Sequence, residues 1–573
     1  MPLAPTHIWQ RVRAGDPLPG LVLFALATIA ALSVLPMATL FARALSDLDQ
    51  GWASALGQVL SDGATWTALK NSLVTCGFGT ALAILLGAGF AFLVTLTDVR
   101  AKAVLIFLFM LPMIIPPQVT ALSWLQLTGP SSALLRAIGM APGLGARNPL
   151  YSAEGITLLL GVQHAPMVFL ALRATLVALP REAVEAARLS GAGRGRVWRD
   201  IVLPLSMPGL IAGGAVAFVS ALGNFGIPAF LGIPANYYVL PTLVYQAMAN
   251  FGTRVIADVA ALSLVISVVV VAAILVQQAL ARRHDHRLVG LASAPLAFAL
   301  GRARPLTELA LWSVLVVILV LPLLALVAAS LVPTFGVRLT TDTASIAAYA
   351  EVLLRQAATI RAIGNSLLLA GAAAILLIGI ALPIAYLAAR SRARGMRAVL
   401  ALIDLPYALP GVVLGVACIL LFLRPLPGLG VSIYGTAWII LFAYLAAFLS
   451  VAFKPIESGL AQLDPALEEA AQSAGAGFAR RMRDIVLPTL APAAAASAIL
   501  VFLIAVNELT VSALLWSGGN ETIGVMIFNL NDGGENAMAS ALSVVVVGLV
   551  LVLMTLLELM GRHLPRGAVP WRS

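Results

Sequence analysis

Two polar segments of this chain carry the same residues in the same order, 284 positions apart. The shared landmarks are a Glu-Ala-Ala triplet, a later glycine and an Ile-Val-Leu-Pro end: Glu185-Ala186-Ala187, Gly191 and 201–204 in the first segment, and Glu469-Ala470-Ala471, Gly475 and 485–488 in the second. Each segment predicts a short helix with one small, flat face, which glycine ends before a second, basic helix begins. Such a helix is suited to lie in a groove of a partner protein. We therefore call residues 180–204 and 464–488 the first and second docking segments.

Polar residues also interrupt the two apolar runs that follow the docking segments. The first run holds Asn224-Phe225 within a stretch rich in Gly and Pro, and the same register 284 positions later holds Asn507-Glu508. In a membrane, a broken helix is tolerated where it packs on protein or lines a cavity, and an ionisable residue there is costly. We therefore expect Asn224, Phe225, Asn507 and Glu508 to line a pathway between the two halves. A structural hydrogen-bonding role for Glu508 is the alternative.

Catalytic chemistry has little support in this sequence. The acidic residues are dispersed, and nothing has the pattern of a nucleophile triad or of a paired acid–base site. His164 lies in an apolar run, and the histidines closest to it along the chain, His284 and His286, are too far away in sequence to suggest a ligand cluster. We expect no catalytic residue and no metal site.

The composition indicates an integral membrane protein. Of the 573 residues, 61% are hydrophobic and 10% are charged, whereas soluble domains carry roughly 25% charged residues. A soluble fold could not bury so much apolar surface. The formal charge of +10 does not imply a nucleic-acid partner, because the basic residues cluster in short loops between apolar runs.

Twelve apolar runs are long enough to cross a bilayer, at about 20 residues for each crossing. They cover approximately 20–42, 72–96, 103–127, 155–178, 209–232, 255–280, 307–331, 366–389, 397–423, 431–453, 490–516 and 537–560. With the N-terminus inside, 26 of the 35 Lys and Arg residues lie on the inner side, as the positive-inside rule expects. The sequence thus predicts an all-α protein of about twelve transmembrane helices, with both termini and both docking segments in the cytoplasm.

The chain reads as a tandem duplication. Asn71-Ser72-Leu73 recurs 294 positions later as Asn365-Ser366-Leu367, and Leu111-Pro112 recurs as Leu405-Pro406. Because each repeat has six spans, both repeats cross the membrane in the same direction, related by an axis along its normal. We expect a first repeat at 1–281, a cytoplasmic linker at 282–305 and a second repeat at 306–573.

The docking segments resemble the EAA loop of permease subunits of type I ABC importers, the binding-protein-dependent family. The resemblance implies two tandem six-helix permease repeats, and the Gly-Asn-Phe-Gly-Ile-Pro stretch at 223–228 resembles the fused permeases of the ferric-iron group. In that family the loop forms a coupling helix that docks on a cytoplasmic ATPase. This implies an ATPase-coupling role for Glu185, Ala186, Ala187, Gly191, Glu469, Ala470, Ala471 and Gly475.

The resemblance also implies partners and cargo. None of the three lysines follows the glycine pattern of a phosphate-binding loop, so we expect this chain to bind no cofactor and a separate subunit to use ATP. The expected partners are two copies of a cytoplasmic ABC ATPase, an external or periplasmic solute-binding protein and the lipid of a bacterial inner membrane. Ferric iron is the favoured cargo, with thiamine, phosphonate and polyamine as alternatives. The alternatives of another class are a multi-span membrane enzyme and an uncoupled channel.

Overall fold

The computed structural model describes residues 18–143, 145–250, 254–283, 298–334, 336–390, 396–425, 430 and 432–560. Helices dominate this part of the chain, which contains no strand beyond one isolated bridge between Thr97 and Phe298. The predicted all-α class is therefore confirmed. Both chain termini and most of the predicted linker lie outside the described residues, so the cytoplasmic placement of the termini and the limits of the repeats stay predictions.

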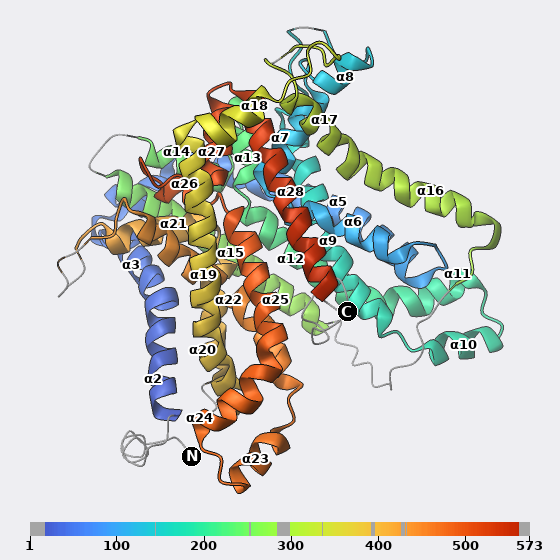
Figure 1. Ribbon diagram of the computed structural model, residues 1–573, viewed down its shortest axis with the longest axis vertical. Coiled ribbons are helices and arrows are strands. Elements are labelled where there is room, and N and C mark those ends of the chain that lie inside the picture. The colour runs from blue at the N-terminus through green and yellow to red at the C-terminus, as the bar shows by residue number, and fades with distance from the viewer. Residues whose placement is uncertain are drawn as a thin grey trace.

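The first half of the chain supplies the helices coloured blue to green in Figure 1. They are α2 (Leu18–Ile29), α3 (Leu35–Ala44), α4 (Ala55–Ser61), α5 (Gly63–Leu96), α6 (Lys102–Ile114), α7 (Pro117–Thr128), α8 (Ala133–Ala137), α9 (Ala153–Val177), α10 (Arg181–Leu189), α11 (Arg194–Val197), α12 (Leu203–Gly223), α13 (Gly226–Leu231), α14 (Leu240–Met248) and α15 (Val255–Arg283).

The second half repeats this order from its long helix onward. Its helices are α16 (Arg304–Leu315), α17 (Leu321–Ser330), α18 (Ala347–Ala350), α19 (Ala357–Arg390), α20 (Met396–Ala408), α21 (Gly411–Phe422), α22 (Ala437–Ala461), α23 (Pro465–Ser473), α24 (Phe478–Arg481), α25 (Leu487–Val506), α26 (Ser512–Leu515), α27 (Ile523–Asp532) and α28 (Asn536–Met560). The corresponding helices α5 and α19 both have 34 residues, and α9 and α22 both have 25.

Ten helices of the described residues are long and apolar enough to cross a membrane, and three bent helix pairs raise the count to as many as 13. Ten of the predicted spans correspond to these ten helices. The predicted spans 103–127 and 397–423 are instead bent pairs, α6 with α7 at 101° and α20 with α21 at 104°. The third bent pair covers 226–248 and includes α14, which lies outside all twelve predicted spans.

Proline causes the two sharpest bends. Pro116 and Pro410 stand directly before α7 and α21 with the same backbone angles, φ −54° and ψ 139°. The residue before a proline is disfavoured in the helical region, and proline itself has no N–H to donate. Both constraints act at the same place in each repeat, so the two halves bend alike.

The predicted spans 209–232 and 490–516 end earlier than expected. Helix α12 stops at Gly223, where the backbone of Asn224 is extended with ψ 118° and its side chain accepts from the Ile227 N–H. Helix α25 stops at Val506, where the side-chain amide of Asn507 donates back to the Leu503 carbonyl at 2.8 Å. A side chain that bonds to the backbone competes with the helix in this way.

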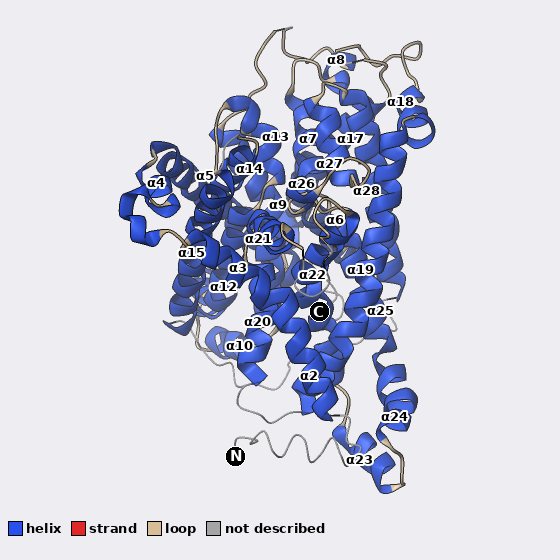
Figure 2. Ribbon diagram, turned by 90° about the vertical axis from the view of Figure 1, so that its left-hand side faces the viewer, coloured by secondary structure: helices blue, strands red, loops and turns tan. Residues whose placement is uncertain are grey.

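The repeats pack as two bundles that exchange their first helices. Helices α5, α9 and α12 pack together in the first half, as do α19, α22 and α25 in the second. Helices α2 and α3 of the first half contact α19, α20 and α21 of the second, whereas α16 and α17 contact α6 and α7 of the first. Helices α10 and α23 project at one end of the molecule, with α8 and α18 at the opposite end (Figures 1 and 2).

Candidate docking helices and translocation site

The two docking segments have matching backbone geometry. Helices α10 and α23 have nine residues each, and the glycines after them, Gly191 and Gly475, have φ of 83° and 85°. The N–H of Ala192 donates to the Ala187 carbonyl, and that of Ala476 to the Ala471 carbonyl, both at 2.9 Å. This is the hydrogen bond of a Schellman end, in which glycine takes the left-handed conformation. The chain then turns into α11 or α24 and returns to the bundle.

The predicted docking residues are largely solvent-facing. Glu185, Ala186, Glu469 and Ala470 are exposed, and the third member of each triplet is partly buried. Two large apolar side chains on the same helices are also exposed, Leu189 at 91% and Leu467 at 53% (these two are not among the predicted residues). Arg181 pairs with Glu185 at 2.5 Å along α10. The geometry leaves a small-residue face uncovered at one end of the molecule, and the docking role of these residues remains a prediction.

The described end of the linker lies beside the first docking segment. The Phe298 N–H donates to the Leu96 carbonyl at 2.7 Å, and the Arg188 guanidinium of α10 lies 5.1 Å from the centre of the Phe298 ring. An arginine over an aromatic face is attracted by the ring's quadrupole. The linker thus contacts both the C-terminal end of α5 and the docking helix that follows α9.

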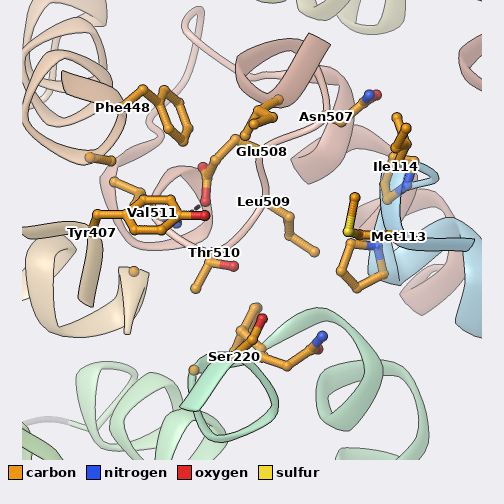
Figure 3. Close-up of a pocket in the computed structure, with 18 of the residues that line it drawn as sticks. Met113, Ile114, Ser220, Tyr407, Phe448, Asn507, Glu508, Leu509, Thr510 and Val511 are labelled. Atoms are coloured by element: carbon orange, nitrogen blue, oxygen red, sulfur yellow. Dashed lines mark hydrogen bonds between the residues drawn. The ribbon is translucent and has the colours of Figure 1, made fainter. Parts of the chain in front are cut away.

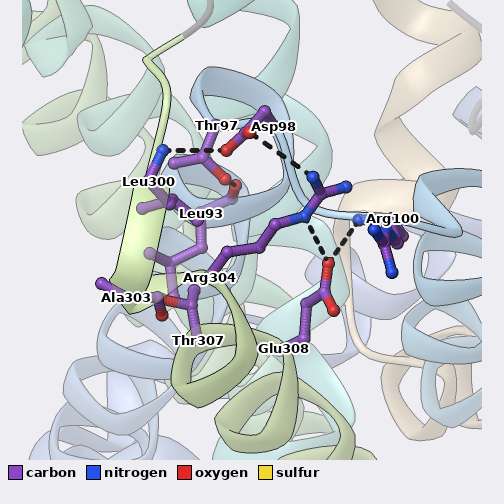
Figure 4. A network of polar contacts seen from close by, with 9 residues as sticks. All are labelled: Leu93, Thr97, Asp98, Arg100, Leu300, Ala303, Arg304, Thr307 and Glu308. Carbon is purple, nitrogen blue, oxygen red and sulfur yellow. Dashed lines mark hydrogen bonds and ion pairs between the residues drawn. The ribbon is translucent and has the colours of Figure 1, made fainter.

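A polar network fixes this end of the linker (Figure 4). The Leu300 N–H donates to Asp98 at 2.9 Å, and Arg304 lies 3.7 Å from the same carboxylate. Arg304 also pairs with Glu308 at 3.0 Å, and the Arg100 N–H donates to Glu308 at 2.9 Å. The Leu300 bond, with a smaller contribution from Arg304, lowers the pKa of Asp98. The network ties the start of α16 to the loop between α5 and α6.

A cavity of about 400 Å³ lies where the helix breaks of both halves meet. Its wall includes Pro116 and Leu409 at the two proline bends, and Gly223 and Asn507 at the ends of α12 and α25. Figure 3 shows side chains from both halves around it. Glu508 is the only Asp, Glu, Lys, Arg or His among the described residues that line it.

The structure brings all four predicted pathway residues to this cavity, but in different ways. Asn224 is buried and accepts from the Ile227 N–H at 3.1 Å, which starts α13. The Phe225 ring is fully buried, with its centre 5.2 Å from that of Tyr245 and 6.4 Å from that of Phe528. The aromatic contacts therefore join α14 of the first half to α27 of the second.

Glu508 both faces the cavity and holds the backbone. Its carboxylate accepts from the N–H groups of Val511 at 2.7 Å and Ser512 at 3.1 Å, and from the Ser512 hydroxyl at 3.0 Å. It therefore caps the short helix α26, a role that a negatively charged side chain fills well. The pathway role and the structural role proposed from the sequence are thus compatible in one residue.

Sequence reasoning missed Gln118, which connects the two halves. Its side-chain amide donates to the backbone carbonyl of Asn507 at 3.0 Å, and both residues are buried. The available signal was its position, two residues after Pro116, but its partner is 389 positions away. The spacing of neighbouring residues in the sequence cannot reveal a contact between two residues so far apart in the chain.

Glycines allow the broken segments to approach one another closely. A Cβ at Gly411 would lie 2.9 Å from Cγ2 of Thr510, and one at Gly524 would lie 2.9 Å from the Glu508 carbonyl oxygen. Contacts under 3.0 Å are essentially absent for real Cβ atoms. The segment that carries Glu508 is thus held between the start of α21 and the start of α27.

Two regions of the chain match the same family of known proteins. Residues 79–289 and 381–569 each match the family described as binding-protein-dependent transport system inner membrane component. The chain belongs to this family. The double match agrees with the duplication read from the sequence, and each matched range contains one docking segment. As a member, the chain is a multi-pass permease subunit of an ABC importer.

Several relatives are similar over much of this permease. It is 27% identical over 475 residues to "Probable ABC transporter permease protein y4fN" of Sinorhizobium fredii, covering 81% of this chain and 82% of that protein. It is 26% identical over 531 residues to the ferric transport system permease protein FbpB of Actinobacillus pleuropneumoniae, covering 90% and 75%. It is 31% identical over 198 residues to the molybdenum transport system permease protein ModB of Escherichia coli, covering 33% and 81%.

Proposed function

We propose that this permease passes ferric iron, delivered by an external binding protein, through the cavity between its repeats. The observation that carries the proposal is the cavity itself, with one carboxylate at the meeting point of the helix breaks. A carboxylate in a pore attracts cations and opposes anions. The long similarity to a ferric permease supports the same cargo.

A pathway must release what it admits, and the lining fits that requirement. Conduction needs binding that is favourable enough for entry and weak enough for exit. No group of three or more His, Cys, Asp or Glu side chains that could hold a metal ion occurs among the described residues. Glu508 with neighbouring amides such as Asn507 would ease the passage of a cation without trapping it.

The energy would come from two copies of a cytoplasmic ABC ATPase, one at each docking segment. The support is the pair of exposed helices with the same length, the same glycine end and the same small-residue face. Their position at one end of the molecule leaves the opposite end for the solute-binding protein. The proposal requires both docking segments to lie in the cytoplasm, and the distribution of basic residues supports that orientation.

Uptake into proteoliposomes tests the cargo. The vesicles would contain the permease with its ATPase and its external binding protein, and radioactive ferric iron, thiamine, putrescine, molybdate and 2-aminoethylphosphonate would be offered separately. We expect only ferric iron to accumulate, and only when ATP is present on the side of the vesicle membrane that carries the ATPase. A matched assembly with an ATPase that cannot hydrolyse ATP is the control. ATP-driven accumulation of another solute in place of iron would contradict the proposed cargo.

A further inference from the structure

The duplicated Asn-Ser-Leu motif marks a clamp at the outer end of each long helix. In α5, the Asn71 amide donates to the Tyr238 carbonyl at 2.9 Å, and the Ser72 hydroxyl accepts from the Leu240 N–H at 2.8 Å. Leu240 is the first residue of α14, whose first N–H groups have no partner within the helix. The clamp therefore fixes the start of α14 to α5.

Helix α19 repeats this clamp in the second half. Asn365 donates to the carbonyls of Gly519 at 3.1 Å and Glu521 at 3.0 Å, and the Ser366 hydroxyl accepts from the Ile523 N–H at 2.8 Å. Ile523 is the first residue of α27. Helices α14 and α27 meet through the aromatic contact of Tyr245 and Phe528, 6.0 Å between ring centres, and both rings pack on Phe225 of the cavity wall. The two clamps therefore hold both sides of this α14–α27 contact, which we call the outer closure of the cavity.

The inner end of α19 holds the second docking helix. The Tyr386 hydroxyl donates to one carboxylate oxygen of Glu468 at 2.9 Å, and Nε of Arg390 donates to the other at 3.0 Å, with Nη2 of Arg390 also bound. Glu468 is the residue of α23 that directly precedes the Glu-Ala-Ala triplet, and only 5% of it is exposed. Removing one partner of a buried ion pair strands the other charge, which is costly.

The first half lacks the residue types for this connection. With the 294-position offset, Phe92 and Leu96 of α5 stand where α19 has Tyr386 and Arg390, and with the 284-position offset Val184 stands where α23 has Glu468. Phe92 instead packs edge to face on Trp198 with ring centres 4.5 Å apart. The two docking helices are therefore joined to their bundles by different chemistry.

We propose that α19 mechanically connects the second docking helix to the outer closure of the cavity, with Glu468 as the positioning residue at its inner end. At 1.5 Å per residue its 34 residues reach about 51 Å. A displacement of α23 by a bound ATPase moves α19 through the ion pair, and α19 moves the start of α27 through Asn365 and Ser366. The two docking segments are thus not equivalent in transmitting ATPase motion. This inference rests on the proposed ATPase-docking function.

A distance measurement at the outer closure tests the connection without any cargo. Cysteines replacing exposed Ala249, at the end of α14, and exposed Gly518, before α27, would carry spin labels, since the natural Cys76 and Cys418 are buried. The permease with its bound ATPase, in nanodiscs, would be compared without nucleotide and after trapping with ATP and vanadate. We expect a shift in the label distance that Glu468→Gln reduces by at least half.

Matched variants separate positioning from general damage. The double variant Glu468→Arg with Arg390→Glu should regain the distance shift, and Glu351→Gln, which removes a partly exposed outer carboxylate 3.9 Å from Arg355, should keep it. A full shift in Glu468→Gln would overturn the inference. Loss of the ATPase subunit from that variant would also overturn it, because Glu468 would then belong to the docking surface. The absence of any shift in the unmodified complex would overturn the proposed ATPase coupling and this inference together.

Discussion

At the scale of single residues, the geometry of Glu508 is compatible with both roles that its sequence position suggested as alternatives, and its pathway role remains a prediction. Its place in an apolar run indicated a cavity or a partner, and the structure provides both, since the carboxylate lines the cavity and caps α26. The same reasoning predicted Asn507 and Asn224, which also line the cavity. Gln118 was not predicted, because its importance comes from a bond to the other repeat.

Substitution of Glu508 should separate its two tasks. Glu508→Gln keeps an acceptor for the Val511 N–H but removes the charge, so we expect iron uptake per folded complex to fall several-fold while thermal stability changes little. Glu508→Leu also removes the cap and should lower stability by about 1 kcal/mol or more. Uptake per correctly folded molecule, together with a melting curve in detergent, distinguishes the two effects. Unchanged specific uptake in Glu508→Gln would remove Glu508 from the pathway.

At the scale of elements, the long apolar helices were predictable and the breaks were only partly so. The duplicated Leu-Pro landmarks indicated a repeat but not the bends, which lie inside the runs predicted as single spans at 103–127 and 397–423. A proline in a membrane helix leaves open whether the helix kinks slightly or turns by 101° and 104°. The size of the bend depends on which backbone N–H and carbonyl groups at the break form hydrogen bonds elsewhere in the protein. The start of α14, for example, depends on Ser72, 168 positions earlier in the chain.

The glycine ends of α10 and α23 provide a prediction for these elements. Gly191 and Gly475 have φ near +85°, where a β-branched side chain is strained by about 1–2 kcal/mol. The double variant Gly191→Val with Gly475→Val should distort both docking helices and abolish ATP-driven uptake, while the amount of permease inserted in the membrane is retained. Gly193→Val serves as a control, since the φ of Gly193 is outside the left-handed range and a Cβ added there would have no atom within 4 Å. Normal uptake in the double variant would show that the angle of these ends is unimportant.

At the scale of the whole molecule, the duplication was the feature that the sequence displayed most clearly. Constant offsets of 284 and 294 positions predicted two repeats, and the family matches at 79–289 and 381–569 agree. The exchange of first helices between the bundles could not be foreseen, because apolar helices offer no sequence signal for their neighbours. The asymmetry between Val184 and Glu468 was visible in the sequence, but its meaning required Arg390, 78 positions away.

The central claim is that the two docking segments each bind one ATPase, and native mass spectrometry of the purified importer tests it most directly. The unmodified complex should contain one permease and two ATPase subunits. Scrambling residues 181–191 should leave a complex with one ATPase, scrambling 465–475 should do the same, and scrambling both should leave the permease alone. Two ATPase subunits on the permease with both segments scrambled would contradict the account.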